Sequence, residues 1–137
     1  MPFTFPSTWA PRLRSVLRIV AGLMFMLHGA LKLLGFPEAG AKLQPHAPAY
    51  LKAAGFIELI GGALIALGLL TSIAAFIAAG EMAVAYFKQH APNGFWPVVN
   101  GGELAALYCF VFLYLAFAGP GPWSIDAMLG RGRGKAS

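Results

Sequence analysis

Hydrophobic residues in this chain gather into four long runs, separated by shorter, more polar stretches. The runs cover about Ser15–Gly35, Ala54–Leu70, Ser72–Phe87 and Gly101–Ala118. A helix needs about 17 to 25 apolar residues to cross the hydrocarbon core of a bilayer, so the two middle runs lie near the lower limit. Only a short turn at Thr71 separates them, which predicts a tight hairpin with Ser72 as the N-cap of the third helix. The pattern predicts an all-α fold, an integral membrane four-helix bundle.

The composition favours a membrane protein over a water-soluble one. Hydrophobic residues make up 58% of the 137 residues and charged residues only 11%, whereas ordinary soluble domains are about 25% charged. The single cysteine, Cys109, excludes an internal disulfide and a CxxC redox motif. Because the net charge of +5 lies mainly near the two ends and forms no patch with interleaved aromatic residues, we expect no nucleic-acid binding.

The basic residues near the two ends also predict the orientation. They are Arg12, Arg14 and Arg18 before or within the first run, and Arg131, Arg133 and Lys135 after the last. Cytoplasmic segments carry an excess of Lys and Arg, so we expect both termini in the cytoplasm. The chain then divides into a cytoplasmic N-terminal segment, 1–14, a four-span membrane domain, 15–129, and a basic tail, 130–137, whose glycine-rich, polar composition predicts disorder.

Five ionisable side chains interrupt the apolar runs, and each run contains at least one of them. They are His28, Lys32, Glu58, Glu81 and Glu103. A charge at the centre of a membrane helix costs roughly 2.5 to 3.5 kcal/mol on insertion scales, so such residues usually face the interior of a bundle and mark a functional site. With the expected orientation, all five fit in the outer half of the bilayer, and the inner half is apolar as far as Arg18. The sequence therefore predicts a polar pocket that opens outward and is closed inward.

Each of these residues also has a structural interpretation. Glu58 and Glu103 fall in the first turns of their helices, where the helix dipole favours a carboxylate. Lys32 can extend to the interface, and His28 can donate a hydrogen bond to a backbone carbonyl. Glu81 lies near the middle of its run and is the hardest to explain by structure alone. We assign no catalytic residue and no metal site, because the Glu-x-x-His pattern of di-iron bundles is absent.

Short motifs occur in order along nearly the whole chain, from about Arg18 to Leu129. They are Arg18-Ile19-Val20-Ala21-Gly22, Leu27-His28-Gly29, Lys32-Leu33, Gly55-x-x-Glu58-x-x-Gly61-Gly62, Glu81-Met82-x-x-Ala85, Phe95-Trp96, Gly101-Gly102-Glu103, Gly119-Pro120-Gly121 and Ser124-Ile125-Asp126. This ordered set resembles the DoxX family of membrane proteins. The resemblance implies a four-helix protein of the bacterial inner membrane, with His28, Lys32, Glu58 and Glu103 in its polar core. It also implies a link to thiosulfate:quinone oxidoreductase or to oxidative-stress membrane complexes.

Three functions fit these observations. We favour a membrane subunit of a redox-linked system that binds a quinone, or a small sulfur or carbonyl compound, in the polar pocket. A quinone site needs a hydrogen-bond donor and a proton-exchanging acid beside an apolar slot. Since the sequence has no CxxC, no Rossmann glycine pattern and no pair of membrane histidines for haem, redox chemistry would require a partner subunit. Besides the lipid membrane, we therefore expect a protein partner or a homo-oligomer. The alternatives are a small-solute or proton-coupled transporter, and an assembly or scaffold subunit without chemistry of its own.

Overall fold

The computed structural model describes residues 3–130, which form helices and loops without a strand. The α-helices are α1 (Ala10–Leu34), α2 (Ala49–Phe56), α3 (Gly62–Leu67), α4 (Thr71–Ala85), α5 (Pro97–Asn100), α6 (Glu103–Ala118) and α7 (Ile125–Met128). The π-helical segments are η3 (Ile57–Gly61) and η4 (Tyr86–His90), and the 3-10 helices are η1 (Ser7–Trp9), η2 (Ala39–Ala41) and η5 (Ala91–Asn93). The predicted all-α class is confirmed.

Two continuous helical segments are long and apolar enough to cross a membrane. They are Ser7–Leu34, with 28 residues, and Ala49–Leu67, with 19 residues, while the apolar helix α6 is shorter, with 16 residues. The second segment begins at Ala49, five residues before the predicted Ala54, directly after Pro48. It ends at Leu67 because Gly68 adopts a left-handed conformation with φ of 71°, which glycine adopts without a steric penalty.

The first of these segments packs closely on the second. Helix α1 contacts α2, η3 and α3 in turn along its length. A Cβ atom added at Gly29 would lie 2.3 Å from the backbone nitrogen of Leu59, and one added at Gly62 would lie 2.4 Å from that of Met26. These glycines therefore let the two backbones touch, which is how membrane helices gain van der Waals contact.

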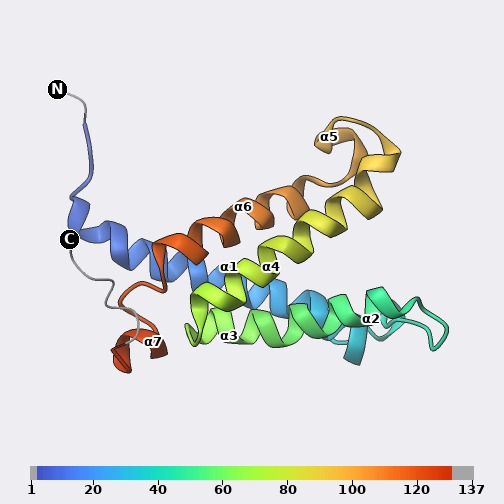
Figure 1. Ribbon diagram of the computed structural model, residues 1–137, viewed down its shortest axis with the longest axis horizontal. Helices are drawn as coiled ribbons and strands as arrows, with labels where there is room; N and C mark the ends of the chain where they lie inside the picture. The colour runs from blue at the N-terminus through green and yellow to red at the C-terminus, as the bar shows by residue number, and fades with distance from the viewer. Residues whose placement is uncertain (1–2, 131–137) are drawn as a thin grey trace.

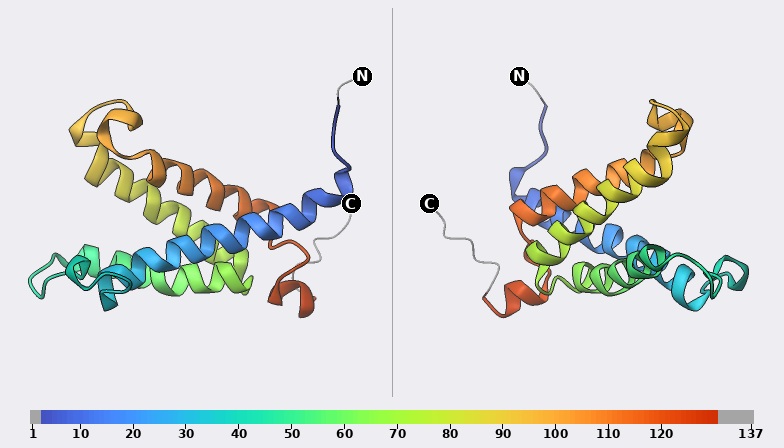
Figure 2. Two further views of the ribbon diagram at one scale, coloured as in Figure 1. Left: turned by 180° about the vertical axis from the view of Figure 1, so that it is seen from behind. Right: turned by 45° about the vertical axis from the view of Figure 1, so that its right-hand side comes forward.

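The other two long helices, α4 and α6, form a second pair. The two pairs cross near the termini and diverge toward the loops, as both figures of the whole chain show (Figures 1 and 2). We call the end that carries α7 the terminal end. The loop end carries residues 35–48 and 91–102. The divergence leaves the pairs tightly packed at one end only.

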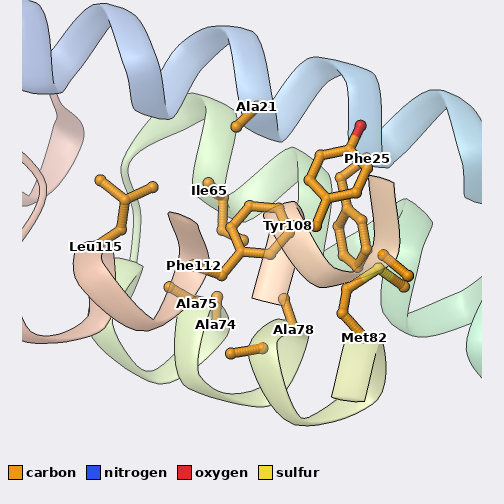
Figure 3. Close-up of a cluster of buried hydrophobic side chains, with 12 residues drawn as sticks. Ala21, Phe25, Ile65, Ala74, Ala75, Ala78, Met82, Tyr108, Phe112 and Leu115 are labelled. Carbon is orange, nitrogen blue, oxygen red and sulfur yellow. The ribbon is translucent and has the colours of Figure 1, made fainter. Parts of the chain in front are cut away.

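The hydrophobic core lies where the pairs meet (Figure 3). Phe25, Ile65, Phe112 and Leu115 have no exposed surface. The Phe112 ring lies 4.8 Å from the Phe25 ring, in an edge-on arrangement. An alanine-rich face of α4 lets α6 approach, because small side chains allow close helix contact. This core lies between the loop end and the terminal end of the molecule.

Arg18 is fully buried at the terminal end. Its Nε donates to the carbonyl oxygen of Pro120 at 2.7 Å. Its Nη1 donates to the carbonyl oxygens of Ile65 and Ala66, each at 2.7 Å, and its Nη2 donates to that of Trp123. The carbonyls of the last turn of a helix have no partner within the helix, so the guanidinium satisfies the end of α3 and ties the C-terminal segment to it.

Asp126, which is far from α4 in the sequence, caps the N-terminus of that helix. Its carboxylate accepts hydrogen bonds from the N–H groups of Leu70, at 3.0 Å, and Thr71, at 2.9 Å, and it also interacts electrostatically with Arg18. The prediction that Ser72 is the N-cap was wrong, because α4 begins at Thr71 and a carboxylate from α7 takes that role. The predicted disorder of the basic tail, 130–137, concerns residues that lie outside the described part of the chain, apart from Gly130.

Replacing Gly29 by alanine tests the close approach of α1 and η3. We expect Gly29→Ala to lower the free energy of unfolding in detergent micelles by about 2 to 3 kcal/mol, because the new methyl group overlaps backbone atoms that cannot move independently. Gly80→Ala is the matched control. A Cβ at Gly80 meets nothing within 4 Å, so this variant should be neutral or slightly stabilising. Equal effects of the two variants would contradict the packing described for α1.

Replacing Arg18 by lysine tests the terminal end. Lysine keeps the charge but cannot match the planar fork that serves four carbonyl groups, and each buried acceptor left unpaired costs about 1 to 3 kcal/mol. We expect Arg18→Lys to lower the unfolding free energy by at least about 2 kcal/mol, measured by denaturant titration in micelles. The exposed Arg12→Lys is the control and should change stability little.

Candidate functional site

Three of the five predicted ionisable residues come together toward the loop end. Lys32 Nζ lies 2.6 Å from Glu58 Oε1, in a salt bridge between α1 and η3. Glu81, from α4, interacts electrostatically with both residues. The Glu58 side chain is only 3% exposed, so protein groups rather than water must stabilise its carboxylate. We call these three residues the charged cluster.

The local structure of each helix brings these side chains together. His28 and Lys32 are four residues apart in α1 and therefore lie on one face. Gly29, between them, is the point of closest approach to η3, which brings Lys32 within reach of Glu58. Glu58 itself lies in η3, a π-helical segment, and such segments often occur at functional sites because the extra residue redirects the side chains.

A cavity of about 290 Å³ lies beside the cluster. We call it the central cavity, and its walls come from α1, η3, α4, η4 and α6. Its polar lining residues are His28, Lys32, Glu58, Gln89, His90 and Tyr108. Its apolar lining residues are Phe25, Met82, Ala85, Leu104 and Ala105, with Gly101 at its edge. The His28 and Tyr108 rings stand edge to face, with their centres 6.0 Å apart.

Three buried oxygen atoms near the cluster lack a hydrogen-bond partner within residues 3–130 when both carboxyl groups are ionised. They are Glu58 Oε2, Glu81 Oε2 and the hydroxyl of Tyr108. Buried polar side-chain atoms are nearly always paired. The carboxyl groups of Glu58 and Glu81 hydrogen-bond to each other through a shared proton, which leaves the Tyr108 hydroxyl as the group that most requires a partner. Glu58 and Tyr108 both line the central cavity, where a bound molecule could supply the missing hydrogen bond.

A second cavity, of about 320 Å³, lies on the other side of the cluster. We call it the side cavity. Glu81 borders it but does not border the central cavity, whereas Glu58 borders only the central one. Lys32, Ala85 and Gln89 border both. The two carboxylates thus face different cavities across a shared wall.

The loop end of the side cavity is bridged by side chains from α2 and η4. Gln89 Nε2 donates to the Tyr50 hydroxyl at 3.2 Å. Lys88 Nζ lies 3.8 Å from the centre of the Tyr50 ring, a cation–π contact. These contacts join the two diverging helix pairs near their outermost point.

Glu103 and the remaining histidines lie differently from the cluster. Glu103 is exposed at the first position of α6 and lines neither cavity, because Ala105 and Tyr108 form the buried face of that helix. His46 is exposed in the loop before α2. His90 lines the central cavity, with Nδ1 at 3.2 Å from the carbonyl oxygen of Asn100, although the sequence analysis had not selected it. No group of three or more His, Cys, Asp or Glu residues that could hold a metal occurs in the described part of the chain.

The sequence analysis also missed the polar role of Tyr108. The signal was available in part, because Ala105, Tyr108, Phe112 and Leu115 follow helical spacing and mark the buried face of α6. A hydroxyl on such a face needs a partner when it is buried. What the spacing does not show is that Glu58, from another helix, lies near enough to interact with it.

Comparison with known proteins places the chain among membrane proteins. The family model described as DoxX matches residues 13–91. A protein of Haemophilus influenzae described as uncharacterized is 45% identical over 126 residues, which cover 86% of this chain and 91% of that protein. An uncharacterized membrane protein of Mycobacterium tuberculosis is 27% identical over 130 residues, covering 84% of this chain and 80% of the relative. No solved structure matches the chain significantly.

Breaking the salt bridge from one side tests the energetics of the cluster. We expect Lys32→Met to lower the unfolding free energy by about 3 kcal/mol, because it leaves the buried Glu58 without its cation. Adding Glu58→Gln to that variant should recover much of the loss, since the uncompensated charge is then gone. Denaturant titrations of the two single variants and the double variant measure the coupling. Additive effects would show that the two side chains do not depend on each other.

Proposed function

This chain belongs to the DoxX family, and we propose that it is a membrane subunit of a redox-linked system that binds a quinone, or a small sulfur or carbonyl compound, in the central cavity. The observation that carries this proposal is the buried Tyr108 hydroxyl without a partner, beside the Glu58 carboxyl group, in the wall of a cavity that also has an apolar side. Ligand sites typically combine an apolar lining with a few convergent polar groups. His28, Lys32, Glu58 and Glu81 are the proposed pocket residues from the original five.

The proposal includes a multi-pass topology in the bacterial inner membrane, with both termini cytoplasmic. It is supported by the four long helical segments, in which α4 continues directly into η4 from Thr71 to His90. Large apolar side chains are exposed on all four, for example Val20, Ile60, Ile73 and Phe110, which suits contact with lipid. The basic residues near the ends favour the cytoplasmic side for the terminal end.

The proposed chemistry of the central cavity follows from the donors and acceptors in its wall. The Tyr108 hydroxyl can donate to a ligand carbonyl oxygen, and the Glu58 carboxyl group can accept a hydrogen bond from a ligand hydroxyl. Lys32 and Glu81 hold the Glu58 carboxyl group in place at the cavity wall. Phe25, whose ring centre lies 5.6 Å from that of Tyr108, adds an aromatic group to the apolar lining. A bound quinone would supply the redox chemistry, with electrons delivered by a partner subunit.

A transporter has less support than a binding subunit. Between the charged cluster and Arg18 the interior is filled by Phe25, Ile65, Phe112 and Leu115, none of which has exposed surface. A translocated solute would need a polar or hydrated route through this core. A site that is accessible from the loop end and closed toward the terminal end suits a ligand that binds, reacts and leaves by one side.

Binding of a chainless quinone tests the proposed function. We expect 2,3-dimethoxy-5-methyl-1,4-benzoquinone to bind the purified protein at a single saturable site, measured by isothermal titration calorimetry. Glu58→Gln and Tyr108→Phe should each weaken binding about tenfold, the effect expected when a well-placed hydrogen bond worth about 1.4 kcal/mol is lost.

Glu38→Gln is the control for that experiment, because Glu38 is an exposed carboxylate in the loop that follows α1. It should bind the quinone as the wild type does. Unchanged affinity in Glu58→Gln, or no saturable binding by the wild type at all, would rule out the central cavity as a quinone site.

A further inference from the structure

The side cavity is one end of a longer groove. It shares Ile57 and Ile77 with another hollow, of about 260 Å³, whose other lining residues are Phe56, Ile60, Gly61, Leu64 and Ala74. Both hollows lie between the helical segment Ala49–Leu67 on one side and α4 on the other. We call these two adjoining hollows together the α2–α4 groove. It extends from Tyr50, at the loop end, to Leu64.

The groove has the length and lining expected for a hydrocarbon chain. At 1.5 Å per residue, the helix from Tyr50 to Leu64 rises about 21 Å, a large part of the roughly 30 Å hydrocarbon core of a bilayer. Its walls are aliphatic or glycine along most of this length. Its charged and amide side chains lie toward the loop end, where they line the side cavity: Lys32, Glu81, Lys88 and Gln89. The groove is therefore apolar along most of its length and polar at the end nearest the loops.

Gly80 keeps the groove open. A Cβ atom at this position would meet nothing within 4 Å, in contrast to Gly29, where it would overlap the backbone of Leu59. Glycine inside a helix costs about 0.5 to 1 kcal/mol relative to alanine, and helix packing gives no reason for it at Gly80. A side chain there would occupy the side cavity, which Gly80 lines.

The charges at the polar end are balanced within the protein. Glu81 hydrogen-bonds to Glu58, which requires that one of the two carboxyl groups holds a proton, and Lys32 pairs with the remaining negative charge. Lys88 already contacts an aromatic ring on α2. A charged head would disturb this balance, whereas a neutral head with hydroxyl groups can hydrogen-bond to Glu81 and accept from Gln89.

We propose that the natural ligand is an amphiphile with one long hydrocarbon chain, which lies in the α2–α4 groove, and a compact neutral head that forms hydrogen bonds at the charged cluster. Lys32, Ala85 and Gln89 border both cavities, so the head can reach the central cavity while the chain leaves through the side cavity. This inference rests on the proposed function and narrows it, because it favours a chain-bearing ligand over a small, water-soluble sulfur or carbonyl compound.

Native mass spectrometry with two lipids of equal chain length tests the groove and the neutral head. The probes are 1-monooleoylglycerol, whose head is neutral and carries hydroxyl groups, and oleate, whose head is anionic. We expect the wild type to retain the glyceride about tenfold better than oleate, and Gly80→Leu to lose about tenfold in retention of the glyceride. Leu107→Phe is the control, because Leu107 is 63% exposed on α6 and lines neither cavity.

Each outcome bears on one part of the inference. Equal retention of the glyceride by Gly80→Leu and Leu107→Phe would overturn the assignment of the chain to the groove. Equal or better retention of oleate would overturn the neutral head. Circular dichroism and thermal unfolding of both variants in the same detergent show whether each is folded. A folded Gly80→Leu variant is expected, because the new side chain enters open space.

Two quinones separate this inference from the proposed function. Decylubiquinone and its chainless counterpart share a head, so the chain should improve affinity in the wild type, after correction for detergent partitioning, but not in Gly80→Leu. The affinity for the chainless quinone should be the same in both proteins. If the chainless quinone binds through Glu58 and the decyl chain adds nothing, the groove inference fails and the function stands. If neither quinone binds while the glyceride does, the function fails and the groove stands.

Discussion

The close contact between the backbones of α1 and η3 determines where the charged side chains of the candidate site lie. At Gly29 the two chains are so close that a single methyl group would overlap main-chain atoms. This distance brings Lys32, one turn further along α1, to 2.6 Å from Glu58. A buried carboxylate is costly without a cation, and a lysine reaches it here only because the helices touch. The close packing at Gly29 therefore positions the ion pair of Lys32 and Glu58.

The buried charges at the two ends of the molecule differ in how many hydrogen-bond partners they have. At the terminal end, Arg18 donates to four carbonyl groups and interacts with Asp126, so four of its five N–H donors are used. At the charged cluster, Lys32 donates to only one oxygen of Glu58, and the nearby Tyr108 hydroxyl has no partner within residues 3–130. A nearly saturated network stabilises a single arrangement, whereas a polar group left unpaired beside a cavity can be used by a ligand. The first end holds the helices together, and the second is the one suited to chemistry.

The arrangement of the two cavities suggests how such a site would be used. A ligand head in the central cavity would touch Glu58 and Tyr108, while Glu81 faces the side cavity across the shared wall. An apolar chain would leave toward the lipid between α2 and α4, so the ligand would not need to pass through water. The core around Phe25 and Phe112 closes the other direction. This geometry suits a subunit that holds a membrane-soluble molecule for a partner.

The sequence by itself determined the all-α class, the approximate helices and the face of α1 that carries His28 and Lys32, because these depend on periodicity within one segment. It did not determine how the helices are rotated against one another. Glu103 was expected in the pocket and is exposed at the start of α6, while Tyr108, one turn and a half later, faces Glu58. The π-helical segments η3 and η4 each change the rotation of the residues that follow, and no periodicity in the sequence marks them. Likewise, only the tertiary structure pairs Asp126 with the start of α4 and Arg18 with the end of α3, since those partners lie far apart in the chain and meet through packing alone.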